Sequence, residues 1–320
     1  MRVIKGWDRG GERVLALGTF DGVHLGHRAL LRRARMLADR VGCPLRVCTF
    51  DRHPLSVISP EKAPLLLTTA GEKAEKLAEA GADEMQVIPF SPAVASLTPD
   101  AFLGKLEEGI RIRGLAAGWN YTFGKDGAGN GETLIREGKE RGFEVLIEAP
   151  FRQDGEPVSS SRIRRALEDG NVKQANDLLG APYMISGMLT ENSSASACRG
   201  ELTVHLPQDK QLPAPGAYAG LIPAGKNGML QALVYFGEKP ASAETAAVCF
   251  VNRAHLFQGS AVRLLLLGKL HGPETPETPE AVRRMRDIDL KAAEKRFMEG
   301  IKADCMQAPE SREHGKDGQK

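Results

Sequence analysis

Residues 19–27, T-F-D-G-V-H-L-G-H, place two histidines three positions apart, with a glycine directly before the second. An apolar run at residues 14–17 precedes them, and apolar residues recur at helical spacing over residues 28–40. His24 and His27 would therefore lie on one side of the first turn of a helix, whose free N–H groups and positive dipole end attract anions. The arrangement favours phosphate binding. A metal site would need further ligands and none has suitable spacing nearby, and a purely structural pair is the other alternative.

Two more segments carry residues suited to a ligand. Residues 50–54, F-D-R-H-P, end an apolar run, and Pro54 holds His53 near an extended conformation that aims its ring over the strand end. Residues 118–131 contain five glycines, three aromatic residues and two amides, so the backbone could approach a flat or charged ligand. Asn120 or Asn130 could donate to a phosphate there. An unremarkable loop and a flexible hairpin are the alternatives when each segment is taken alone.

A fourth segment, residues 158–167, reads V-S-S-S-R-I-R-R-A-L. The serines would cap a helix, and Arg162 with Arg165, or Arg164 alone, could reach forward over its start. Such a helix start predicts a site for the β- and γ-phosphates of a nucleotide. An ordinary capped helix with solvated arginines accounts for the same residues, but the four segments together are far less expected by chance than any one.

The elements that must position these segments alternate in type. An apolar run predicts a strand at residues 14–17, and further strands are predicted at residues 45–50, 84–88, 114–118 and 143–147. Helices are predicted at residues 28–40, where apolar residues recur at helical spacing, and at residues 71–80, 99–108 and 131–142. Alternating strands and helices indicate an α/β fold, a Rossmann-like doubly wound parallel sheet covered on both faces. Ligands bind outside the carboxyl ends of such strands, so chemistry is expected in the loops after Leu17, Phe50 and Gly118.

The sequence pattern changes after residue 180. Short strand-like pieces at residues 202–206, 229–235, 246–252 and 261–266 are separated by proline and glycine turns and predict a small antiparallel β-barrel or sandwich. A charged helix at residues 280–300 would close it, and the last residues look disordered. We therefore expect three parts: residues 1–183, residues 184–305 and a tail of residues 306–320.

Composition limits the class of protein. The chain has 320 residues, about two domains, with 43 Lys and Arg against 41 Asp and Glu, a net charge of +2 that argues against a general nucleic-acid binder. Five scattered cysteines predict neither a disulfide framework nor a zinc site. The sequence shows neither an apolar run long enough for a membrane span nor a signal-peptide core, so we expect a cytoplasmic enzyme or binding protein.

In this order and spacing, G-T-F-D-G-V-H-L-G-H, F-D-R-H-P, G-W-N-Y-T-F-G-K and V-S-S-S-R-I-R resemble the adenylyltransferase module of the bacterial bifunctional riboflavin kinase/FAD synthetases. That module belongs to the nucleotidyltransferases with an H-x-G-H signature. The resemblance covers residues 1–183, and the second and third motifs narrow it to the flavin branch.

The resemblance implies transfer of AMP from ATP to the terminal phosphate of FMN, giving FAD and pyrophosphate, with Mg²⁺ held mainly through nucleotide phosphates and no residue assigned as its ligand. It gives catalytic roles to His24, His27, Asn120 and Arg164. The substrate and nucleotide would contact Gly18, Phe20, Asp21, Gly22, Gly26, Phe50, His53, Phe123, Gly124, Ser159, Ser160 and Arg162. Of these, Ser160, Arg162 and Arg164 would hold the pyrophosphate, and Phe50 and His53 would lie near the flavin or its phosphate.

The second half departs from the family pattern. The family's kinase domain is a small barrel with a G-x-P-T-A-N stretch and a later Glu base, but residues 200–203, G-E-L-T, occupy the P-T-A-N slot, and the base position falls near Ala247. A carboxylate at a phosphate site repels, and a missing base leaves the riboflavin hydroxyl poorly activated. Glu244 could be a displaced base. P-G-A-Y-A at residues 215–219 and residues 285–293 still resemble the barrel frame and its closing helix.

The sequence thus predicts an FMN adenylyltransferase with a kinase-like domain that has lost its chemistry. One alternative keeps both activities, and another is a flavin- or nucleotide-binding regulator without turnover. The expected partners are ATP and FMN, and riboflavin if the kinase is kept, with no nucleic acid or membrane. Oligomerisation or pairing with a separate riboflavin kinase is a further expectation.

Overall fold

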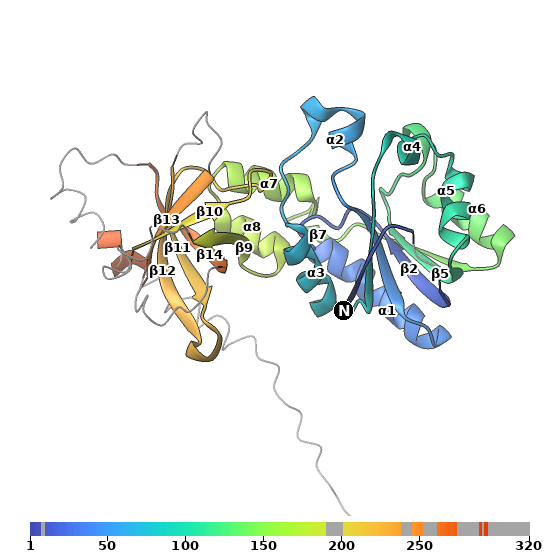
Figure 1. Ribbon diagram of the computed structural model, residues 1–320, viewed down its shortest axis with the longest axis horizontal. Coiled ribbons are helices and arrows are strands. Elements are labelled where there is room, and N and C mark those ends of the chain that lie inside the picture. Colours follow the sequence, from blue (N-terminus) through green and yellow to red (C-terminus); the bar gives the residue numbers. More distant parts are fainter. Residues whose placement is uncertain are drawn as a thin grey trace, which may run out of the picture.

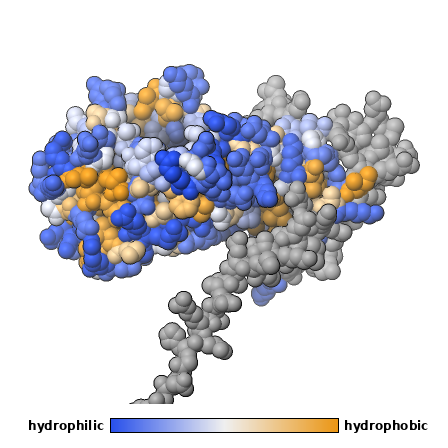
Figure 2. Space-filling view, turned by 180° about the vertical axis from the view of Figure 1, so that it is seen from behind, coloured by the Kyte–Doolittle hydropathy of each residue, from blue (hydrophilic) through white to orange (hydrophobic). Residues whose placement is uncertain are grey.

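The computed structural model describes residues 1–7, 10–189, 201–237, 245–251, 261–273, 288–289 and 291–293. They form an α/β part and a barrel that lie side by side, with α7 and α8 between them (Figure 1). On the face seen from behind, hydrophilic residues predominate and hydrophobic patches gather over the α/β part (Figure 2).

A six-stranded parallel sheet forms the first part, in the order β1-β4-β3-β2-β5-β6. Its strands are β1 (Arg2–Lys5), β2 (Glu12–Leu17), β3 (Leu45–Phe50), β4 (Glu84–Ile88), β5 (Arg111–Gly118) and β6 (Glu144–Glu148). The helices between them are α1 (Leu25–Val41), α2 (Leu55–Ile58), α3 (Ala70–Glu79), α4 (Pro92–Ala95), α5 (Pro99–Glu107) and α6 (Gly131–Arg141), with short 3-10 turns at Pro60–Lys62 and Lys125–Gly127. The predicted doubly wound α/β fold is confirmed.

The side chains of β2 alternate between the two faces of the sheet and contribute to an apolar core on each face. Val14 and Ala16 pack with α1 and α3 on one face, and Leu15 and Leu17 pack with α5 and α6 on the other. Successive side chains of a strand point to opposite faces, so a strand buried on both sides reads as a continuous apolar run. This is why the apolar run at residues 14–17 predicts a central strand.

The second part is a closed antiparallel barrel in the order β10-β13-β12-β11-β14-β9. Its strands are β9 (Tyr183–Leu189), β10 (Glu201–Leu206), β11 (Gly216–Pro223), β12 (Met229–Phe236), β13 (Thr245–Val251) and β14 (Ala261–His271), with a 3-10 turn at Gly225–Asn227. Of the predicted closing helix, residues 288–289 and 291–293 are described and helical, and Asp289 accepts hydrogen bonds from Tyr235 and His271. The predicted barrel is confirmed.

Two helices connect the parts and share the core of the barrel. After the small hairpin β7 (Arg152–Gln153) and β8 (Glu156–Pro157) come α7 (Ser160–Glu168) and α8 (Val172–Leu179). Their buried Ile163, Leu167 and Leu178 belong to the same apolar cluster as Val204 and Leu264 inside the barrel. The boundary expected at residue 183 is therefore crossed by continuous packing.

Several sequence expectations lie outside the described residues: Gly200, Glu244, the segment 257–259, most of the helix 280–300 and the tail 306–320. Prediction missed β1, β9 and β11. Only Ile4 of β1 is buried, and β11 is built largely from glycine and alanine, so neither carries a strong apolar signal. A search of the described residues finds no helix long and apolar enough to cross a membrane.

Candidate active site at the switch point of the sheet

The strand order places a ligand site at the carboxyl ends of β2 and β5. From β2 the chain winds outward through β3 and β4, and then crosses to β5 on the other side of β2. Crevices at such reversals bind ligands in α/β proteins. A cavity of about 540 Å³ lies there, lined by residues from the loops after Leu17, Phe50 and Gly118 and from the start of α7. The structure thus brings together the loops in which the sequence predicts chemistry.

The loop from β2 to α1 adopts strained backbone. Phe20 and Val23 have φ of 50° and 44°, and Gly22 between them has φ of 84°. Left-handed backbone is uncommon for non-glycine residues and unusual for β-branched valine, and costs about 1–3 kcal/mol per residue. Phe20 and Val23 are fully buried, so apolar packing holds the turn in place. The turn delivers His24 to the helix start.

His24 and His27 form a stacked pair at the first turn of α1. His24 is the N-cap, and its Nδ1 accepts the backbone N–H of His27 at 3.3 Å. The ring centroids lie 3.7 Å apart with planes inclined by 14°, and Phe20 packs 5.1 Å from the His27 ring. A Cβ on Gly26 would lie 3.2 Å from the His24 ring, which is closer than an ordinary van der Waals contact. Glycine at this position avoids that close contact. Both histidines line the cavity.

Burial keeps both rings neutral. It lowers the pKa of His24 to about 4, and it lowers the pKa of His27 together with the nearby His24 and Lys73. Because Nδ1 of His24 accepts a hydrogen bond, the proton of the neutral ring sits on Nε2, which is a fixed donor. Nδ1 of His27 has no hydrogen-bond partner among the described residues. The pair therefore offers neutral N–H donors rather than cations.

The lowered pKa of His24 predicts a stability that falls in mild acid. The unfolded chain takes up a proton near pH 6.5 and the folded chain only near pH 4, so stability is complete above pH 6.5 and is lost as the pH falls toward 4. At ~1.4 kcal/mol per pH unit, the loss is about 3 kcal/mol. Urea unfolding of wild type and His24→Asn, which keeps a capping side chain, should give free energies whose difference changes by this amount between pH 7.5 and pH 4. Parallel pH curves would contradict the buried neutral ring.

The glycine-rich loop after β5 forms another wall of the cavity. Asn120 is exposed and lines the cavity together with Phe123 and Gly124. Gly124 has φ of 74°, and a Cβ there would lie 2.8 Å from Pro99, so this glycine serves packing as well. Asn130 lies elsewhere: it caps α6 by accepting the N–H of Thr133. Of the two candidate amides, the structure brings only Asn120 to the cavity.

The start of α7 separates the predicted serines and arginines. Ser159 caps the helix and Ser160 donates to the carbonyl of Asp21 at 2.9 Å, and both line the cavity. Arg164 also lines it. Arg162 is not among the lining residues, because its guanidinium bonds to the β7–β8 hairpin, including the carbonyl of Gln153 at 2.9 Å. A contact of Arg162 with pyrophosphate would need the side chain to leave that hairpin.

Asp21 is the centre of a buried network that sequence reasoning did not foresee. One or both of its carboxylate oxygens accept from the N–H groups of Leu67 and Thr68 at 3.0 Å, from the Thr68 hydroxyl at 3.1 Å and from Arg164. Arg164 also donates from Nε to the carbonyl of Leu65. We call Asp21, Leu67, Thr68 and Arg164 the Asp21 network. These residues are joined by hydrogen bonds, so Asp21 and Arg164 position the loop between β2 and α1 in addition to lining the cavity.

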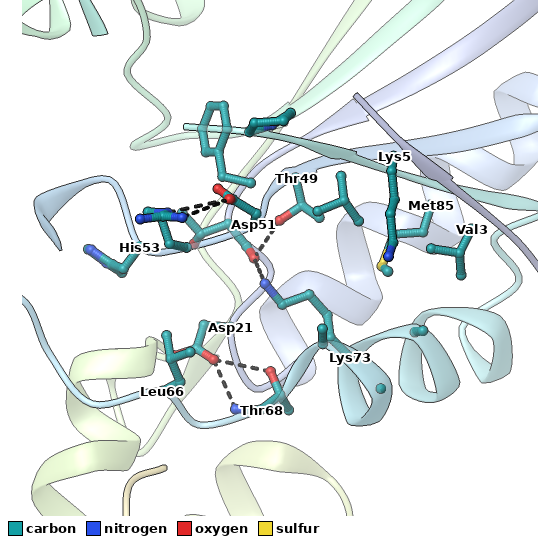
Figure 3. A pocket seen from close by; sticks show the side chains of 18 residues that line it. Val3, Lys5, Asp21, Thr49, Asp51, His53, Leu66, Thr68, Lys73 and Met85 are labelled. Carbon is teal, nitrogen blue, oxygen red and sulfur yellow. Dashed lines mark hydrogen bonds and ion pairs between the residues drawn. The ribbon is translucent and has the colours of Figure 1, made fainter. Parts of the chain in front are cut away.

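A second cavity, of about 510 Å³, opens on the side of β3 and β4 (Figure 3). Thr19, Asp21, Phe50 and His53 line both cavities, so the two are contiguous. The far end of the second cavity is lined mainly by the apolar residues Val3, Ala70, Ala74, Met85 and Val87, with Lys5 beside Val3 and Met85 (Figure 3). Pockets of this size and lining typically hold a small molecule with a flat or apolar portion.

Lys73 is a functional candidate that sequence reasoning missed. It projects from α3 into the second cavity, and within the described residues its Nζ donates to the carbonyl of Thr19 at 2.8 Å, leaving further N–H groups for a ligand (Figure 3). Burial lowers its pKa, and Asp21 nearby opposes that shift. Helical periodicity could have placed Lys73 on α3, but not on the face toward a cavity.

Metal binding by the protein alone has little support at this site. The described residues hold no group of three or more His, Cys, Asp or Glu side chains arranged for a metal ion. The carboxylate of Asp21 is already occupied by four donor groups, and Asn120 offers a single amide oxygen. These donors fit a Mg²⁺ ion bound chiefly by nucleotide phosphates.

Comparison with known proteins agrees with this geometry. The FAD synthetase family profile matches residues 8–162. The bifunctional riboflavin kinase/FMN adenylyltransferase of Listeria monocytogenes is 36% identical over 65% of this chain and 67% of its own length. That of Escherichia coli K12 is 36% identical over 64% and 66%, and that of Haemophilus influenzae is 30% identical over 71% and 74%. A solved structure described as a macrolide-efflux protein from Streptococcus pneumoniae superposes with a TM-score of 0.79 at 27% identity, covering 92% of this chain and 99% of that one.

A doubly wound sheet with an H-x-G-H helix start at its switch point defines the class of the first part, a nucleotidyltransferase domain. The chain belongs to the family of bifunctional riboflavin kinase/FMN adenylyltransferases, and its first part is an FAD synthetase domain. The matched segment spans about two thirds of the first relatives, so it leaves a third of their length unmatched.

Proposed function

We propose that this protein transfers AMP from ATP to FMN, producing FAD and pyrophosphate, and that its barrel no longer phosphorylates riboflavin. The observation that carries the first statement is that two cavities share lining residues after β2 and β3, and that the neutral pair His24 and His27 lines one of them. A transferase that joins two phosphates needs two ligand sites meeting where charge develops.

The chemistry of the lining divides the substrates between the cavities. The 540 Å³ cavity has the N-termini of α1 and α7 on its wall, so it suits the triphosphate of ATP. The apolar end of the 510 Å³ cavity suits the isoalloxazine ring of FMN, with the FMN phosphate directed toward Lys73 and His53. The shared residues Thr19 and Phe50 would then lie between the acceptor phosphate and the α-phosphate.

The reaction requires no protein nucleophile. An oxygen of the FMN phosphate forms a bond to the α-phosphorus of ATP while the bond from that phosphorus to the bridging oxygen of pyrophosphate breaks. Charge on the five-coordinate phosphorus is stabilised by Nε2–H of His24, by His27 and by backbone N–H groups of α1. Mg²⁺ bound to the phosphates would supply further charge neutralisation.

The remaining site residues take binding or positioning roles in the proposal. Asn120 contacts the nucleotide phosphates, and Phe123, with Gly124, shapes the nucleotide cavity. Ser160 donates to a phosphate only if its hydroxyl leaves the carbonyl of Asp21. Gly18, Gly22 and Gly26 allow close packing of the turn; a Cβ on Gly18, for example, would lie 3.0 Å from the Phe20 ring. Asp21 and Arg164 act through the Asp21 network, Ser159 caps α7, and Arg162 approaches pyrophosphate only if it leaves the hairpin.

Loss of kinase chemistry is supported by one described position. Ala247 lies on β13 opposite Val204 of β10, is fully buried and belongs to the core of the barrel. Where the family resemblance expects a Glu base, the barrel has a methyl group in apolar packing, which cannot accept a proton. A separate riboflavin kinase would then have to supply FMN. We propose that the adenylyltransferase comprises residues 1–183 and the kinase-like barrel residues 184–305. We also propose that the protein acts in the cytoplasm.

Incubation with each flavin separates the candidate functions. With FMN, ATP and Mg²⁺, we expect FAD and pyrophosphate in equal amounts; with riboflavin and ATP, we expect no FMN. Chromatography of the flavins and a pyrophosphate assay measure both. Formation of FMN from riboflavin would establish the bifunctional alternative, and absence of both FAD and pyrophosphate would leave a non-catalytic flavin-binding protein.

A further inference from the structure

The segment Leu65–Thr68 lies between the barrel and the adenylyl transfer site. On the barrel side, the N–H of Leu66 donates to the carbonyl of Asp209 at 2.7 Å, and the N–H of Gln211 donates to the carbonyl of Leu66 at 2.8 Å. These two bonds make Leu66 and Lys210 a parallel β-bridge, so a single loop of the barrel pairs with this segment as a strand would.

Lys210 reinforces that pairing from within the interface. Its side chain is fully buried, and Nζ donates to the carbonyls of Leu67 and Met184 at 2.7 Å and to Glu72 at 2.5 Å. All three ammonium protons are therefore used. Glu72 in turn accepts from the N–H of Thr69 and, on β9, from the N–H of Ser186. One barrel side chain thus joins the segment, α3 and β9.

The opposite side of the same segment binds the loop between β2 and α1, which contains Asp21 and Gly22. The N–H groups of Leu67 and Thr68 bind the Asp21 carboxylate, and the Thr68 hydroxyl accepts the N–H of Gly22 at 3.1 Å. Leu66 and Thr68 also line the 510 Å³ cavity, whereas neither lines the 540 Å³ cavity (Figure 3). Displacement of the segment would alter the flavin side of the site first.

We propose that Lys210 is a positioning residue for adenylyl transfer, through which the barrel holds Leu65–Thr68 in the conformation that shapes the flavin cavity and orients Asp21. The inference rests on the proposed function and extends it, because it assigns the barrel a role that requires no kinase chemistry. A buried charge is a costly way to join two surfaces unless its hydrogen bonds are complete. Here the three donors of Lys210 are matched by the carbonyls of Leu67 and Met184 and by the Glu72 carboxylate.

Lys210→Met in the full chain tests the proposal, because methionine keeps much of the apolar stem and removes the charge and its donors. We expect KM for FMN to rise about tenfold and kcat to fall by about tenfold or more, since small displacements of bound groups lower rates steeply. KM for ATP should stay within about twofold. Flavin fluorescence titration should show the same weakening of FMN binding without turnover.

Arg263→Met is the matched control. Arg263 on β14 bridges to Glu75 of α3 across the same interface, but the pair is solvent-exposed, and so its loss should change each constant less than about twofold. Lys210→Gln, which keeps amide donors, should lie between Lys210→Met and wild type in KM for FMN. Circular dichroism and thermal unfolding check that each variant is folded at the assay temperature.

The outcomes separate this inference from the proposed function. An inactive wild type would overturn the function itself. An active wild type with Lys210→Met indistinguishable from Arg263→Met, or with equal changes in KM for FMN and ATP, would overturn the positioning role. Failure of both Lys210 variants to fold would also overturn it, because Lys210 would then support the whole fold rather than this segment.

Discussion

Replacing His27 with alanine should lower kcat for FAD formation by about 10²–10³-fold, the usual effect of removing one preorganised donor from a transition-state site. His27 stacks on His24 beside the cavity, and burial keeps its pKa below the ordinary value, so it acts as a neutral donor toward charge that develops during transfer. Alanine is a strong helix former in the first turn of α1, and therefore the fold should tolerate the change.

Flavin binding supplies the control for His27→Ala. His27 lines the 540 Å³ cavity and not the 510 Å³ one, so Kd for FMN measured by fluorescence should stay within about twofold. His27→Asn, which restores an N–H donor at a different reach, should recover part of the rate. Equal losses in kcat and FMN binding would contradict a role specific to the transition state.

Removing the carboxylate of Asp21 should have the largest effect on stability. Asp21→Ala leaves the Arg164 guanidinium and the N–H groups of Leu67 and Thr68 without their acceptor in a buried site. Breaking one partner of a buried ion pair costs about 3–5 kcal/mol. We expect a loss of that size in the free energy of unfolding, measured in urea, and no measurable FAD formation, because the turn that delivers His24 loses its anchor.

Arg162 of α7 supplies the comparison. Asp154 pairs with Arg162 at 3.4 Å, but its side chain is 77% exposed, so Asp154→Ala should cost less than about 1 kcal/mol. The double variant Asp21→Ala with Arg164→Met should be more stable than the sum of the single losses predicts, since the unpaired charge is gone. Similar costs for Asp21→Ala and Asp154→Ala would refute the Asp21 network.

Prediction from sequence succeeded where the signal is local. The continuous apolar run at residues 14–17 marked β2, because a strand buried on both faces favours apolar residues at every position. Prediction also found β3 and β4, although they carry buried polar side chains such as Arg46 and Glu84. His24 and His27 were assigned to one helix turn because three residues nearly complete a turn. The same reasoning failed for β1, an edge strand with one buried residue, and for β11, whose glycines and alanines carry little apolar periodicity.

By itself, the sequence determined the class of the protein, the order of most of its elements and the loops that line the 540 Å³ cavity, because caps, periodicity and glycine turns act within a few residues. Only the tertiary structure decided which arginine of α7 reaches the cavity and which holds the hairpin. It also decided that Asp21 meets Arg164 across 143 positions and that Lys210 meets Glu72 across 138. Such contacts depend on how separate elements pack, and no spacing along the chain encodes the distance between them.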